Sequence, residues 1–165
     1  MDNSPRSSGT RPLEELYRDE YVSLHGDPHG PLLRYTRSSV PFPLLVDVER
    51  SFESLIEAVD RWGRRGRVVF ADARAAPGRN DPAFEAVMRR LWPRMYRGIE
   101  RVGVLVQSTI GKMHVERLAQ EDGVARKVSL DEQELLDYLL STDPPPASRT
   151  PASRGRATPA RGNKS

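Results

Sequence analysis

The sequence predicts an α/β protein built on a single mixed sheet of about five strands, in the order β-β-α-β-α-β-α-β-α. Two continuous apolar runs, VVFA at 68–71 and VGVLV at 102–106, are typical of central strands covered on both faces. Segments with helical spacing of apolar residues separate the strands, and glycine and proline mark their ends. Repeated strand–helix–strand units require right-handed crossovers, so we expect a parallel sheet centre with helices packed on the sheet.

The first part of the chain predicts a β-hairpin at one edge of this sheet. Residues 13–17 are expected to form only a short turn, and residues 21–24 the first strand. A second strand follows at 32–37. Between the two strands, residues 25–31 are rich in glycine, proline and aspartate, which supply the backbone angles of a tight turn.

The next two helices are predicted from their ends as much as from their apolar stripes. The first runs from about Leu45 to Gly63, a residue type that suits a C-terminal cap. The second begins with Asp81 as N-cap and Pro82 at the first helical position. Pro93 lacks an amide donor, so it should kink or end this helix near its last turn.

Two further helices flank a short strand at 124–129. The last helix begins at Asp131, with Glu134 as its capping-box partner, and ends before the proline run that starts at Pro144. The earlier helix covers about 109–120, and its apolar residues should face inward: Ile110, Met113, Val115 and Leu118.

Composition limits the chemistry that is open to this chain. Its 165 residues include no cysteine, which excludes disulfides, thiolate metal sites and cysteine nucleophiles. No apolar run approaches the roughly 18 residues of a membrane span, and the first residues lack the apolar core of a secretory signal. We therefore expect a soluble, cytoplasmic protein.

Both ends of the chain differ in composition from its centre. We predict a disordered N-terminal segment at 1–14, one folded domain at 15–141, and a disordered basic tail rich in proline, alanine and arginine at 142–165. Residues 144–165 hold five basic residues and no acid, which leaves 21 basic against 23 acidic residues in 1–143. The tail has no aromatic residue to stack on bases, so we expect no specific nucleic-acid binding.

Two loops follow the central strands and should share one edge of the sheet, where ligands bind in open parallel sheets. Their polar side chains, beside two helix N-termini, suit an anion or a partner. Alternatively, the two aspartates neutralise the arginines in a structural cluster of salt bridges. The candidate ligand- or partner-binding residues are Asp72, Arg74, Arg79, Asn80, Asp81, Ser108, Thr109 and Lys112.

Metal and catalytic sites have weaker support. His25 and His29 lie four residues apart in a turn, and no third ligand accompanies them, so we expect no metal site. The STIGK string at 108–112 has the wrong glycine spacing for a phosphate-binding loop. Without a nucleophile–base pair or clustered carboxylates, we expect a noncatalytic protein with no cofactor.

Several strings resemble the SpoIIAA-like family, whose fold is shared with STAS domains and is compared with lipid-binding domains. They are IERVGVLV at 99–106 and VSLDE at 128–132, and the resemblance extends over about 15–141. The strings at 72–85 and 106–123 look like a bacterial subgroup of such proteins.

The resemblance implies a noncatalytic regulatory or protein-binding module with an unidentified protein partner. The alternative is a carrier of a lipid or another small apolar ligand, held in a gap between helices and sheet. The PFPLL segment at 41–45 motivates this alternative because it could cover such a gap as an apolar flap, although it could equally just pack.

Phosphorylatable STAS domains carry a serine or threonine where the helix after the third strand begins. The corresponding segment here is GRNDP at 78–82, without a hydroxyl group, so the resemblance implies a member that lacks the usual phosphorylatable serine. Asp81 either fixes a permanent negative charge at this place or is an ordinary N-cap.

Overall fold

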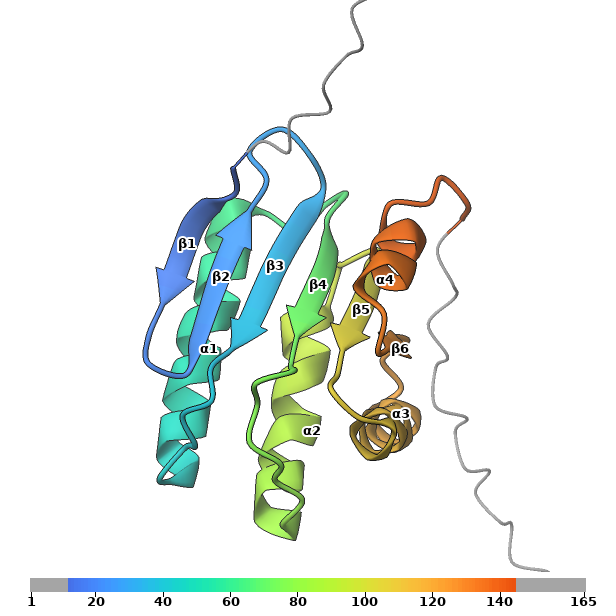
Figure 1. The fold of residues 1–165 in the computed structure, drawn as a ribbon. Helices are drawn as coiled ribbons and strands as arrows, with labels where there is room; N and C mark the ends of the chain where they lie inside the picture. Colours follow the sequence, from blue (N-terminus) through green and yellow to red (C-terminus); the bar gives the residue numbers. More distant parts are fainter. Residues whose placement is uncertain (1–11, 145–165) are drawn as a thin grey trace, which may run out of the picture.

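The computed structural model describes residues 12–144. Within them, six strands form one sheet in sequential order (Figure 1). The strands are β1 (Glu14–Arg18), β2 (Val22–Gly26), β3 (Leu32–Arg37), β4 (Val68–Asp72), β5 (Arg101–Leu105) and β6 (Lys127–Ser129). The pairs β1–β2 and β2–β3 are antiparallel, and β3 to β6 run parallel. The predicted mixed sheet with a parallel centre is confirmed.

Helices cover both faces of this sheet. They are α1 (Leu45–Trp62), α2 (Pro82–Tyr96), α3 (Thr109–Asp122) and α4 (Glu132–Leu139). α1 and α2 pack side by side behind the sheet and α4 lies in front of it, while α3 lies next to α2 near the carboxyl ends of β5 and β6 (Figure 1). The larger core cluster lies under α1 and α2, and a smaller one lies under α4.

β4 and β5 fix the position of the candidate loops. They are parallel neighbours, with Val69 opposite Val102 and Asp72 opposite Leu105. The loops after the two strands therefore leave the sheet at the same edge, as the sequence predicted.

The prediction for residues 13–17 was wrong, because β1 pairs with β2 and raises the strand count from about five to six. β2, the hairpin partner of β3, therefore lies inside the sheet, and β1 is the edge strand. β1 gave no alternating signal because its register shifts between Glu15 and Tyr17, and because only Leu16 and Tyr17 pack against the core. A bulged edge strand of this kind carries too little buried surface to show a period of two.

The predicted inward stripe of α3 was also wrong in part. Leu118 is buried, but Ile110 is 81% exposed and Met113 is 65% exposed. α3 packs against α2 and β6 rather than over the middle of the sheet, so only a narrow part of its surface is covered.

Helix ends followed the predictions with one difference. α2 ends at Tyr96, so Pro93 lies in its last turn, as predicted. At α4, Asp131 accepts the amide protons of Gln133 and Glu134, as expected of an N-cap. The Glu134 carboxylate, however, accepts the Ser129 hydroxyl rather than the Asp131 amide, so only half of the predicted capping box forms.

None of the helices in residues 12–144 combines the length and the apolar character that a bilayer span requires. The segments predicted to be disordered, 1–14 and 142–165, fall almost wholly outside the described residues, so that assignment stays a prediction.

Candidate functional site

Strand alternation divides the candidate residues between the two faces of the sheet. In β4, Val69 and Ala71 belong to the core under α1 and α2, whereas Val68 and Phe70 belong to the core under α4. Asp72 follows on the α4 side. The loop after β4 therefore starts from an ion cluster on one face and contributes to a pocket on the other.

The ion cluster is centred on the buried Asp72 carboxylate. It accepts hydrogen bonds from Arg74 Nη2 at 2.6 Å and from Arg34 Nη2 at 3.2 Å. Arg34 also donates from Nη1 to Glu132 on α4, at 2.9 Å. Burial raises the pKa of Asp72, but the hydrogen bonds from Arg74 and Arg34 outweigh it and leave the pKa below its ordinary value. Each charge has an internal partner, so the cluster ties β3, β4 and α4 together.

Arg79 and Asp81 form a second ion pair at the start of α2. Arg79 Nε donates to Asp81 Oδ2 at 2.5 Å, and Asp81 Oδ1 accepts the Phe84 amide at 3.0 Å. The hydrogen bond from Arg79 and then that from the Phe84 amide lower the pKa of Asp81. At both aspartates the structure thus shows the internal pairing that was the alternative to an anion site.

A pocket of about 600 Å³ lies on the other face, between the sheet and helices α1, α2 and α3. Its walls are mainly apolar and aromatic, and include Ala71, Val104, Val106, Met88, Trp92 and Tyr96. Exposed members of the lining, such as Ile110 and Asn80, mark its mouth beside the loops that follow β4 and β5.

Four of the eight candidate residues line this pocket: Arg74, Arg79, Asn80 and Ser108. Asp72 and Asp81 are held in the ion pairs described above, and Thr109 and Lys112 do not take part in the lining. Lys112 Nζ instead lies 3.8 Å from Oε1 of Glu116, one turn further along α3. Ser108 Oγ accepts the Gly111 amide at 3.1 Å and so caps α3.

Two arginines in the pocket wall were missed at the sequence level. Arg37 ends β3 on the same face as Leu33 and Tyr35, and this spacing of two residues could have shown that it points inward. Its guanidinium donates to the carbonyl oxygens of Tyr21 and Val40, and burial lowers its pKa. Arg126 lies in the irregular segment before β6, where the sequence has no regular spacing of apolar residues that shows which way a side chain points.

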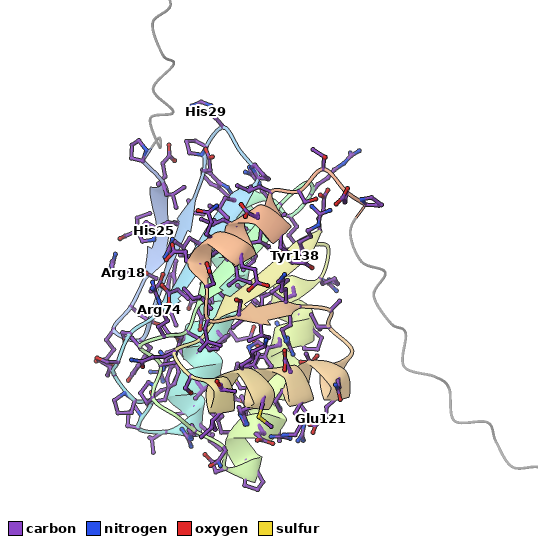
Figure 2. The ribbon with its side chains drawn as sticks, turned by 45° about the vertical axis from the view of Figure 1, so that its right-hand side comes forward. Arg18, His25, His29, Arg74, Glu121 and Tyr138 are labelled. Atoms are coloured by element: carbon purple, nitrogen blue, oxygen red, sulfur yellow. The ribbon has the colours of Figure 1, made fainter. Side chains whose placement is uncertain are left out.

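Neither of the two histidines of the predicted turn lines this pocket. His25 is on β2, with Nε2 3.5 Å from Glu15, and His29 is on the loop between β2 and β3, at the opposite end of the sheet from Arg74 (Figure 2). Across residues 12–144 no group of three or more histidine, aspartate or glutamate side chains is placed to hold a metal ion.

No protein-family model matches this chain, and no curated protein matches it. Its structure is similar to the crystal structure of an uncharacterised protein of the DUF3478 family with a SpoIIAA-like fold, from Shewanella loihica. The TM-score is 0.54, and the alignment covers 72% of this chain and 91% of that chain at 14% identity. This chain has a SpoIIAA-like fold. The fold that the sequence resemblance implied is therefore confirmed.

In this SpoIIAA-like fold, the Ser108 hydroxyl and the His114 imidazole of the pocket wall each have other neighbours. Ser108 Oγ caps α3, and His114 Nε2 lies 3.9 Å from Glu85 Oε1 while its Nδ1 is 3.3 Å from Arg117. Among the described side chains, no hydrogen bond connects Ser108 with His114. The pocket can enclose an apolar ligand and form hydrogen bonds with a few polar groups on it.

Proposed function

We propose that this chain is a noncatalytic binding protein that holds a small, largely apolar ligand in the pocket beneath its sheet. The pocket itself carries the proposal. Protein interiors are close-packed, and voids larger than a water molecule are few. A space of about 600 Å³ with mainly apolar walls is instead of the size and character of ligand sites.

Small residues in the wall explain how the sequence leaves this space open. Ala71 and Ala73 occupy the end of β4 and the residue beyond it, where larger side chains would reach into the pocket. Gly111, in the first turn of α3, is a third small residue in the wall. The wall on the side of α2 consists of large side chains, most of them aromatic.

The apolar segment 41–45 supports the same proposal. Phe42 lines the pocket and is itself buried, with its ring centroid 4.3 Å from that of Tyr21. Leu44, two residues later, is 61% exposed. The segment therefore contributes one residue, Phe42, to the pocket wall.

Denaturing extraction of the purified protein, followed by mass spectrometry, tests this function. We expect a small apolar compound in about equal amount to the protein. A variant with a filled pocket, Gly111→Phe, purified in parallel, should release far less of it. The proposal fails if the two proteins release the same compounds and no apolar compound raises the melting temperature of the wild-type protein alone.

A regulatory or protein-binding role is the second candidate, and exposed apolar side chains favour it. Ile110 and Met113 stand on the outer side of α3, and Leu44 and Val46 are exposed at the start of α1. Met113 does not line the pocket, so Met113→Ser separates the two roles. If this face binds a protein, Met113→Ser should weaken its recovery in a pull-down without changing the extracted ligand, whereas equal recovery would argue against this face.

A further inference from the structure

Arg126 places buried hydrogen-bond donors in the wall of the pocket. Its side chain is 1% exposed and lies over the rings of Trp92, at 4.8 Å, and Tyr96, at 5.8 Å. Nη2 donates to Asp122. Nε and Nη1 have no acceptor among residues 12–144. A buried donor without an acceptor is unfavourable, so such a group needs an explanation.

Asp122 does not bind the remaining donors. Its side chain is fully buried, one oxygen accepts from Arg126 Nη2, and the other accepts the Val124 amide at 2.9 Å. Arg126 and both of the rings that hold it line the pocket. The free N–H groups thus lie buried within the wall of the space that the proposed ligand would fill.

The charge of the pocket wall points to an anion. Its charged lining residues are arginines, and none of the lining residues, all within 35–126, is acidic. Arg74 and Arg79 are paired with Asp72 and Asp81. Arg37, in contrast, donates to the carbonyl oxygens of Tyr21 and Val40, and the Asp19 carboxylate acts on its charge only from a distance, without an ion pair among the described residues. A charge inside apolar walls is weakly screened, which favours a ligand with a compensating negative charge.

We propose that the ligand is an apolar carboxylic acid, bound as its carboxylate, which accepts hydrogen bonds from the free N–H groups of Arg126. Its apolar body extends from Arg126 between the sheet and α2 towards the mouth at Ile110. This inference rests on the proposed function and names the chemistry of its ligand.

Decanoate and decan-1-ol, which share their apolar body, provide the test. Titration calorimetry of the full chain near neutral pH should show decanoate binding at least about tenfold more tightly than the alcohol, as expected for a buried charge-assisted hydrogen bond. The double variant Asp122→Asn/Arg126→Gln keeps an amide–amide hydrogen bond without leaving a lone buried charge. It should lose about tenfold in decanoate affinity and leave the alcohol unchanged, while the surface variant Arg90→Gln, at an arginine that does not line the pocket, should keep the preference.

The wild-type protein gives a second readout that does not depend on the double variant folding. The NMR signal of the Arg126 Nε–H group, assigned by its loss in Arg126→Lys, should shift on addition of decanoate and not on addition of decan-1-ol. If neither compound binds, the proposed function fails together with this inference. If both bind equally, or if the double variant keeps the preference, the ligand pocket stands and the role of Arg126 is overturned.

Discussion

Ala71 and Asp72 are consecutive residues of β4 that serve opposite faces of the sheet. Ala71 lines the pocket under the sheet, and the Asp72 carboxylate binds Arg74 and Arg34 on the side of α4. Because side chains alternate along a strand, the same end of β4 contributes to the ion cluster on one face and to the pocket on the other. The charges of the ion cluster are paired with one another, whereas the pocket leaves a space for a ligand.

Asp72→Asn should lower stability in a pH-dependent manner. The pKa of Asp72 is lower in the folded protein than its ordinary value of 3.8, so its contribution is fully present above that pH. The contribution is lost as the pH falls through the lowered pKa. We expect a deficit of about 1 kcal/mol at neutral pH, modest because Arg34 and Arg74 are partly exposed.

Urea unfolding of both proteins at a series of pH values measures this deficit. The difference in unfolding free energy should be constant from neutral pH down to about pH 4 and should shrink below it. A difference that stays the same into strong acid would show that the ion pair with Arg74 does not stabilise the fold.

Gly103→Val should destabilise the protein by about 1–3 kcal/mol through overpacking. A Cβ atom at Gly103 would come within 3.2 Å of Leu135 and 3.3 Å of Leu139, so α4 lies directly on this glycine of β5. Gly78→Ala is the matched control, since a Cβ there meets nothing within 4 Å. Thermal unfolding should separate the two variants, and equal melting temperatures would contradict the close packing of α4.

The central strands and most helix ends were predictable because the signals are local. The runs at 68–71 and 102–106 are apolar on both faces, and Asp81 with Pro82 marks the start of α2 without reference to the rest of the chain. β1 was missed because its register shift removes the alternation on which strand prediction depends. Ile110 was misplaced because helical spacing says which side of a helix is apolar, but not how much of that side a neighbour covers.

The pocket could not be predicted in the same way. Four of its wall residues, Arg74, Arg79, Asn80 and Ser108, follow from the rule that loops after parallel strands meet. The cavity itself arises because Ala71 faces large side chains of α2 that do not fill the space between them. Such a mismatch of volumes depends on the packing of elements that are distant in the sequence. Arg126 enters the wall through the same packing, over Trp92.

Gly111→Phe should close the pocket without unfolding α3. A Cβ atom at Gly111 would meet Ser108 Oγ at 3.4 Å and Val106 Cβ at 3.8 Å, which are ordinary contact distances, and both residues line the pocket. Gly111→Ala adds only a methyl group and should raise the unfolding free energy by up to about 1 kcal/mol, because glycine is unfavourable in a helix. Decanoate binding should be lost in the first variant and kept in the second. Unchanged binding in Gly111→Phe would place the ligand elsewhere.

Asp81→Asn asks whether the negative charge at the start of α2 has a role beyond capping. Asparagine accepts the Phe84 amide as well as aspartate does, so the variant should keep α2 intact and lose only the ion pair with Arg79. Asp81→Ala removes the cap as well and should melt at a lower temperature than either protein. If the charge imitates a phosphoserine towards a protein partner, Asp81→Asn should weaken partner recovery in a pull-down at an unchanged melting temperature. Full recovery with Asp81→Asn would leave Asp81 as an N-cap whose charge is neutralised by Arg79.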